Sequence, residues 1–174
     1  MNDRREDLYE QDELEKMVDI TNLSYEDLLR LCAGFINDEL LTADNIRKLK
    51  IDSEEEKLAR HYMHQASTFF IEGTITKELL REKRISCWTT HDKYSKEDLD
   101  QWRATGEYKI STQQNLFRLI VCCLYADWDE SGMNCEYDAG EALSLFFNCL
   151  MELGSGYCRQ LRLYLQKRLI PADD

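Results

Sequence analysis

Residues 116–125 read LFRLIVCCLY, a run in which Arg118 is the only charged side chain. A helix that is apolar on almost every side has to be buried on almost every side. Residues 139–153 read AGEALSLFFNCLMEL and have the same character. Two such helices that follow each other in the chain pack side by side in opposite directions. The sequence therefore predicts a central antiparallel hairpin formed by residues 113–126 and 139–153.

Amphipathic segments, with apolar residues three or four positions apart, lie on both sides of this hairpin in the sequence. Ser24, Ser53 and Ser95 are each followed three residues later by an acidic residue. This pattern is typical of a helix start, because the serine hydroxyl accepts a backbone N–H that has no partner within the helix. The helix after Ser95 is expected to be short and to end near Gly106. A final helix over residues 157–170 is expected to point its leucines inward and its basic side chains outward.

Two further stretches complete the predicted fold. Residues 1–20 combine many acids with a narrow apolar stripe, which predicts a peripheral acidic helix. Residues 85–94 have the composition of a strand but are short, which favours an isolated extended loop. With one proline and seven glycines the chain offers few other breaks. The prediction is an all-α, compact, single-domain bundle of about six or seven helices over residues 1–174.

The composition restricts the class of partner. Lys and Arg number 22 against 34 Asp and Glu, which gives a formal net charge of −12. Such a charge argues against direct binding of nucleic acid or of an anionic membrane, and favours a basic protein partner. The most apolar run, residues 119–126, is far shorter than the roughly 20 residues of a membrane span. The seven cysteines are an odd number without a Cys-x-x-Cys pair. The first residues are polar and mostly acidic, so we expect no export leader. We expect reduced thiols and a cytoplasmic location.

The negative charge is concentrated. Residues 121–150 contain six acids and no base. Two aromatic residues lie among them, as is typical of interface anchors. An ordinary solvated loop is the alternative interpretation. The predicted partner-binding residues, here called the acidic rim, are Asp127, Trp128, Asp129, Glu130, Glu136, Tyr137, Asp138 and Glu141.

Residues 127–138 also fit part of the twelve-residue calcium loop of helix-loop-helix proteins. Gly132 stands at the turn position, but Asn134 stands where an aliphatic residue is usual, and no second loop is present to pair with this one. A calcium- or magnesium-binding module is therefore an alternative function. The candidate ligands are Asp127, Asp129, Ser131 and Asp138.

Catalytic signatures are weak. His61, His64, Cys87 and His91 could supply zinc ligands, but their spacing matches no standard zinc motif. Phosphate loops, nucleophile elbows and His-Glu-x-x-His are absent from the sequence. A small enzyme is a second alternative, and we expect no cofactor.

These observations together favour a non-catalytic inhibitor that masks a basic surface. Small acidic immunity or antitoxin proteins of bacteria, which neutralise nuclease toxins, share this general character. In this hypothesis the carboxylates of the acidic rim pair with the lysines and arginines that a nuclease uses to hold phosphate. Trp128 and Tyr137 would supply the apolar anchors.

Overall fold

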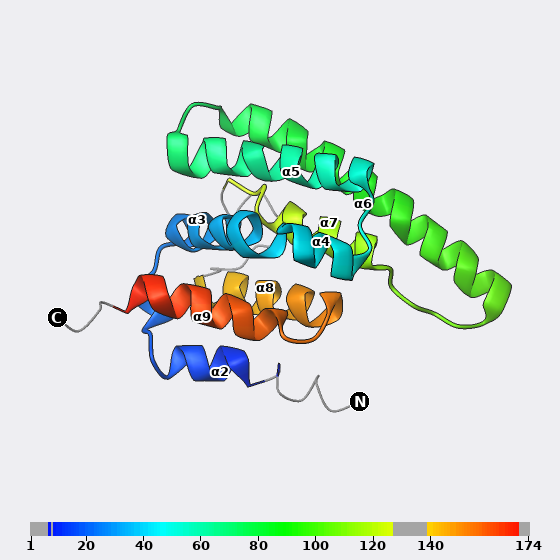
Figure 1. Cartoon of the computed structure of the whole chain (residues 1–174). Coiled ribbons are helices and arrows are strands. Elements are labelled where there is room, and N and C mark those ends of the chain that lie inside the picture. The colour runs from blue at the N-terminus through cyan, green and yellow to red at the C-terminus, as the bar shows by residue number, and fades with distance from the viewer. Residues whose placement is uncertain (1–6, 8, 127–138, 171–174) are drawn as a thin grey trace.

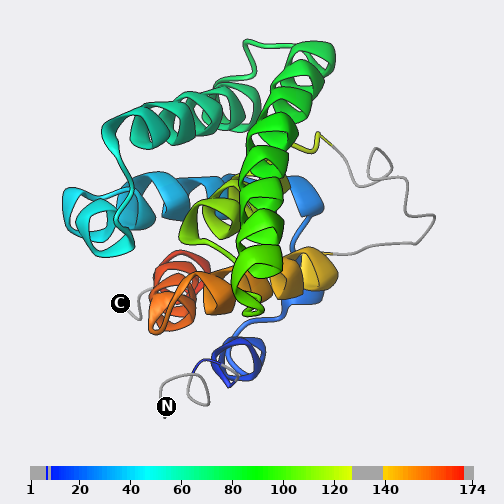
Figure 2. The same cartoon turned by 90° about the vertical axis from the view of Figure 1, so that its right-hand side faces the viewer.

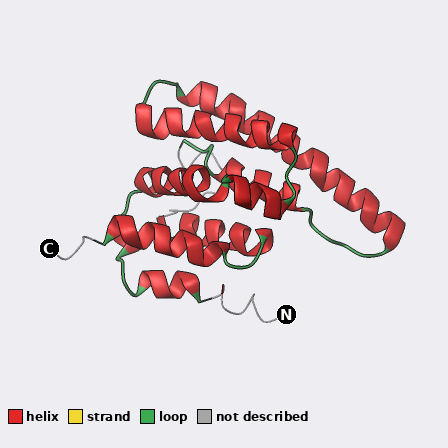
Figure 3. Cartoon of the chain, in the orientation of Figure 1, coloured by secondary structure: helices red, strands yellow, loops and turns green. Residues whose placement is uncertain are grey.

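The computed structural model describes residue 7 and residues 9–126 and 139–170, and within these the regular structure is entirely helical (Figure 3). Its α-helices are α2 (Glu10–Glu15), α3 (Tyr25–Phe35), α4 (Ala43–Leu49), α5 (Ser53–Ser67), α6 (Lys77–Thr105), α7 (Thr112–Cys122), α8 (Ala139–Leu153) and α9 (Tyr157–Leu169). Short π-helical segments, Ile36–Leu40 and Thr68–Glu72, continue α3 and α5. The prediction of an all-α bundle is confirmed.

The central hairpin is also confirmed. Helices α7 and α8 pack against each other in opposite directions, and α3, α5, α6 and α9 surround them (Figure 1). Leu116, Phe117 and Leu119 on α7 are inaccessible to solvent, as are Leu143 and Leu150 on α8. The second helix has the predicted bounds, whereas the first ends at Cys122 rather than at residue 126.

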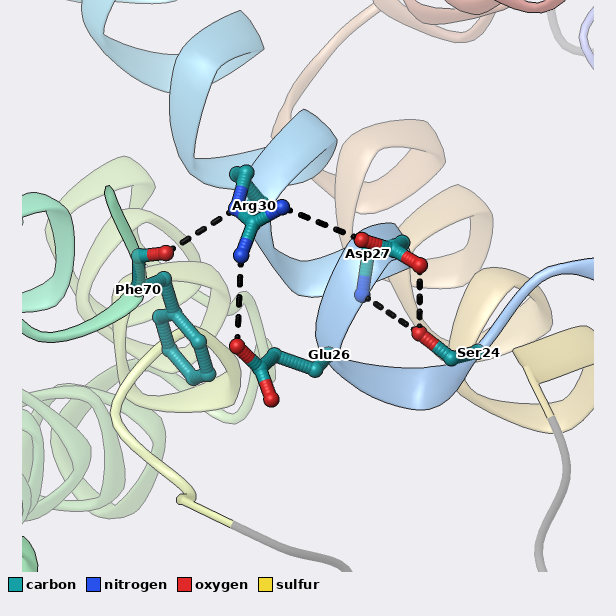
Figure 4. Close-up of polar contacts among 5 residues, drawn as sticks. All are labelled: Ser24, Glu26, Asp27, Arg30 and Phe70. Atoms are coloured by element: carbon teal, nitrogen blue, oxygen red, sulfur yellow. Dashed lines mark hydrogen bonds and ion pairs between the residues drawn. The ribbon is translucent and has the colours of Figure 1, made fainter. Parts of the chain in front are cut away.

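The predicted start at Ser24 is confirmed, because the Ser24 hydroxyl accepts the backbone N–H of Asp27 at 3.1 Å (Figure 4). One turn later, Arg30 donates hydrogen bonds to Asp27 and Glu26 and to the backbone carbonyl of Phe70, 2.9 Å from its Nε. Arg30 thus joins the start of α3 to the π-helical end of α5.

The start near Ser53 is shifted by one residue. Asp52 is the capping residue, and its carboxylate accepts the backbone N–H groups of Glu54 and Glu55. The Glu55 carboxylate in return accepts the backbone N–H of Asp52. This reciprocal pair is a capping box, placed one position before the predicted one.

The predictions for residues 85–94 and for a helix start at Ser95 are wrong. Both stretches lie inside α6, a continuous helix of 29 residues. Burial of Cys87 and His91, one turn apart, holds this part of the helix against the bundle. The hydroxyls of Thr89 and Thr90 donate to carbonyls four residues earlier and so stay within the helical pattern. Tertiary packing here overrides the weak helix propensity of Ser and Thr.

Among the described residues of the stretch 1–20, the structure places the short helix α2 beside α9 (Figure 1). Its Glu10 forms an ion pair with Arg162 of α9. The carboxylate oxygens of Asp7 each lie 3.3 Å from the backbone N–H of Gly156, which precedes α9. Negative charge at a helix N-terminus is favourable because the helix dipole is positive there.

Helix α6 crosses the face of the bundle, and its last turns, from residue 99 on, extend beyond it (Figures 1 and 2). Among the helices described, none is both long enough and apolar enough to cross a membrane.

Candidate protein-binding site

Most of the acidic rim lies outside the described residues. Of its predicted members only Glu141 is described, and it is exposed in the first turn of α8. The partner-binding prediction and the calcium-loop prediction therefore stay predictions. The residues concerned are Asp127, Trp128, Asp129, Glu130, Ser131, Glu136, Tyr137 and Asp138.

The candidate zinc ligands do not converge. In the described ranges, no cluster of three or more His, Cys, Asp or Glu side chains is arranged to hold a metal ion. His61 and His64 are exposed on α5, whereas His91 is buried on α6, with its ring against Trp88. Cys87 is fully buried, and its thiol contacts the carbonyl of Phe117 at 3.8 Å. Burial raises the pKa of the Cys87 thiol well above its usual range, which is the opposite of what a nucleophilic thiolate requires.

The end of α6 carries large apolar side chains that are exposed to solvent. Every residue from 99 to 109 is exposed, and this segment, here called the α6 tip, includes the last turns of the helix and the start of the connection to α7. Leu99, Trp102 and Tyr108 are its large apolar side chains. Figure 2 shows the helix in front of the bundle, and Figure 1 shows its end projecting past the other helices.

The spacing of buried residues along α6 explains why Trp102 stands out. Positions 80, 84, 87, 91 and 98 are buried, at intervals of four, three, four and seven residues. These intervals define one face of the helix. Trp102 comes four residues after the last of them and so continues the same face beyond the edge of the bundle. Trp102 therefore lies on the core-facing side of α6, yet 45% of its surface is exposed.

The base of the α6 tip is closed by a polar contact. The buried carboxylate of Asp98 accepts the backbone N–H of Ser111, with 2.7 Å between the two heavy atoms. The helix ends at Gly106 in the left-handed region, at φ 76°, and the chain then returns to Ser111, which caps α7. The tip is thus held at both ends by the bundle.

Trp102 and Tyr108 contact each other on the tip. Their ring centroids are 6.2 Å apart and their planes are inclined by 84°, an edge-to-face arrangement. Tyr108 is 57% exposed. The neighbouring Arg103 and Asp100 form an exposed ion pair at 3.0 Å. Aromatic side chains surrounded by polar ones are typical of the energetic centre of a protein–protein interface.

Sequence reasoning missed this site because it divided α6 at Ser95. It did place the end of the helix near Gly106, which the structure confirms. The signal was the apolar register itself, since positions 80, 87 and 91 predict that residue 102 shares their face. Comparisons with protein-family models, with curated proteins and with solved structures found no match to this chain.

Proposed function

We propose that this chain is a non-catalytic protein-binding module and that it holds its partner on the α6 tip. The observation that carries the proposal is the aromatic pair of Trp102 and Tyr108, which continues a core-facing stripe of α6 into solvent. Covering two such rings with a partner removes a large apolar area from water. The closed base at Asp98 and Ser111 adds to this, because an ordered anchor loses little conformational entropy on binding.

The net charge supports a basic partner. At −12 the chain attracts cationic proteins and repels nucleic acid. Glu97 and Glu107 are exposed close to the aromatic pair in the sequence and would lie at the rim of an interface centred on it. In its most specific form, the proposal is that the chain is a bacterial immunity or antitoxin protein that covers the basic surface of a nuclease toxin.

The thiols support a location in a reducing compartment, and we propose the cytoplasm. The cysteines that the structure describes are all free: Cys32, Cys87, Cys122, Cys123, Cys149 and Cys158. Disulfides form and persist in oxidising compartments, whereas thiols stay reduced in the cytosol.

The test of the proposed site compares the aromatic pair of the α6 tip with an exposed apolar side chain nearer the start of the same helix. The partner is first captured from native lysate with the full chain, and its dissociation constant is then measured with purified proteins. Combined Trp102→Ala and Tyr108→Ala substitutions are expected to raise the dissociation constant about 30-fold or more, as loss of an aromatic hot spot does. Ile85→Ala, at a site 57% exposed, is the matched control and is expected to change it less than about twofold. Equal affinity of both variants would show that the partner binds elsewhere.

The charge of the partner is tested separately. Glu97→Lys combined with Glu107→Lys is expected to slow association with a basic partner and to weaken its dependence on salt, because like charges then meet at the interface. If the partner is a nuclease, an equimolar amount of this chain is expected to abolish its cleavage of nucleic acid. Undiminished cleavage by a nuclease that binds the chain would contradict the immunity function.

A further inference from the structure

Helix α9 has a charge unlike that of the rest of the chain. It carries Arg159, Arg162, Lys167 and Arg168 and no acidic residue. In a chain with a net charge of −12, such a helix is a local concentration of positive charge.

Acidic groups of this same chain contact α9 at three places. Glu10 of α2 pairs with Arg162, and both side chains are more than four-fifths buried. Asp38 lies 3.5 Å from Arg168, whose guanidinium also lies over the ring of Tyr164. Asp7 occupies the N-terminal end of the helix, as described above. At all three places the group that contacts α9 is a carboxylate.

One face of α9 is left to solvent. Arg159, Leu163, Lys167 and Ile170 are exposed and follow each other at intervals of four, four and three residues, which places them on a single stripe. Leu163 is 47% exposed and Ile170 is 36% exposed. The stripe thus alternates basic and aliphatic side chains.

The surface along this stripe is hollowed. A depression of about 420 Å³ is lined by Leu163, Gln166, Lys167 and Ile170. A neighbouring one of about 360 Å³ shares Ile170 and runs between the end of α9 and the segment after α2, where it is lined by Met17, Val18, Asp19, Asn22, Leu23, Leu169 and Ile170. The surface of both is mainly apolar, with Lys167 as the basic residue of the first and Asp19 as the acidic residue of the second. The two depressions form one groove, here called the α9 groove.

We propose that the α9 groove is a second docking surface and that its occupant is an acidic amphipathic helix of a partner protein. Aliphatic side chains of that helix would fill the two depressions, in the helix-in-groove mode of peptide recognition. Its carboxylates would pair with Arg159 and Lys167, which are eight residues and therefore about 12 Å apart along α9. These ion pairs would be of the same kind as those that Glu10 and Asp38 form with Arg162 and Arg168 on the other sides of α9.

The experiment uses the full chain and two synthetic helical peptides. The acidic peptide has Leu at helical spacing and Glu on both sides of that stripe, and the second peptide is identical except for Lys in place of every Glu. Binding is followed by fluorescence anisotropy, and the site by backbone amide shifts in nuclear magnetic resonance spectra. We expect the acidic peptide to bind and to shift the amides of residues 159–170, and the basic peptide to bind at least tenfold more weakly.

Variants locate the contact. Leu163→Glu places a like charge in the groove and is expected to weaken binding of the acidic peptide at least tenfold. Leu58→Glu, at an exposed leucine of α5, is the matched control and is expected to leave the affinity unchanged. Unchanged melting temperatures for both variants would exclude unfolding as the cause. The variant that combines Trp102→Ala with Tyr108→Ala is expected to bind the acidic peptide normally. Failure of the α6-tip proposal and failure of this one are therefore distinguishable.

Three results would overturn the proposal. The first is equal affinity for the two peptides, since it would remove charge as the determinant. The second is binding whose amide shifts lie away from α9. The third is a preference for vesicles containing phosphatidylserine over the acidic peptide, since the stripe would then be a membrane contact.

Discussion

Helix α7 and the tip of α6 both have an apolar stripe at helical spacing, but the stripe of α7 is buried and that of the tip is exposed. Phe117 of α7 lies on an apolar stripe and is fully buried, whereas Trp102 of α6 continues an apolar stripe and is nearly half exposed. The difference lies in the neighbours. Helix α7 has α5, α6 and α8 around it. Helix α6 has 29 residues against 11 in α7, and its last turns extend past the helices that pack against it. Apolar spacing predicts which face of a helix packs against another element. The arrangement of the helices decides whether the chain itself supplies that element.

The comparison separates two kinds of effect. Substitutions in the hairpin are expected to act on the free energy of unfolding, and substitutions in the tip on binding. Stability and binding measurements on single variants test whether the two effects are in fact separate.

The largest loss of stability is expected from Phe117→Ala. The Phe117 ring stacks on Tyr94 with centroids 5.8 Å apart and meets Tyr62 edge-on at 6.4 Å, so its removal leaves a cavity among three helices. The free energy of unfolding is expected to fall by about 3–5 kcal/mol, measured by urea denaturation. A loss below about 1 kcal/mol would mean that the hairpin is not the centre of the core.

Alkaline pH is expected to lower the free energy of unfolding more than any surface substitution does. Burial raises the pKa of the Cys158 thiol from near 9 to about 12, and burial also raises the pKa of Cys32 and Cys87. These thiols stay protonated in the folded state while the unfolded chain ionises. The stabilisation is therefore fully present below about pH 9 and is lost as the pH rises from there toward 12.

The urea midpoint is thus expected to be lower at pH 10.5 than at pH 8. Cys158→Ala is expected to make this decline shallower, because one of the contributing thiols is gone. Equal midpoints at the two pH values would contradict the burial of these groups.

A smaller and local effect is expected from Gly106→Ala. A Cβ at this position would meet nothing within 4 Å, so the cost comes from the backbone at φ 76° alone. It is expected to be about 1 kcal/mol, and to speed amide hydrogen exchange in residues 99–109 more than in α7. Gly106→Asn is the control and is expected to cost less, because asparagine tolerates this conformation. Faster exchange throughout α7 would show that the tip and the hairpin unfold together.

The smallest effect on stability is expected from Trp102→Ala. Its ring has only Tyr108 as a described aromatic neighbour, so the free energy of unfolding is expected to change by less than about 0.5 kcal/mol. Thermal unfolding of the purified variant measures this. A loss above about 2 kcal/mol would assign Trp102 to the core and remove it as a binding anchor.

The sequence predicted best where burial leaves no alternative. Residues 139–153 are apolar around the whole helix, and the predicted and observed bounds of α8 are the same. The sequence-based prediction was wrong at residues 85–94, where Ser, Thr, Trp and His have modest propensity for any structure. Packing of α6 against α5 and α7 determines the helical conformation there. Local composition carries no information about such contacts.

The candidate site was less predictable than the fold. The acidic rim was chosen from charge density, and apart from Glu141 it lies outside the described residues. The α6 tip has little net charge and no motif, so composition does not mark it. Its position depends on where the bundle ends relative to α6, which is a property of the packed helices and not of any segment alone.

The hydrogen bond between Asp98 and Ser111 has a practical consequence for protein engineering. It holds the two stems of the α6 tip side by side, so the intervening dozen residues can be exchanged for a short Gly-Ser linker, or a reporter domain can be grafted between the stems, with little strain on the bundle. The same closure makes the tip portable: a cyclic peptide with the sequence of residues 98–111 reproduces its end-to-end constraint and becomes a natural starting point for a competitor of the partner.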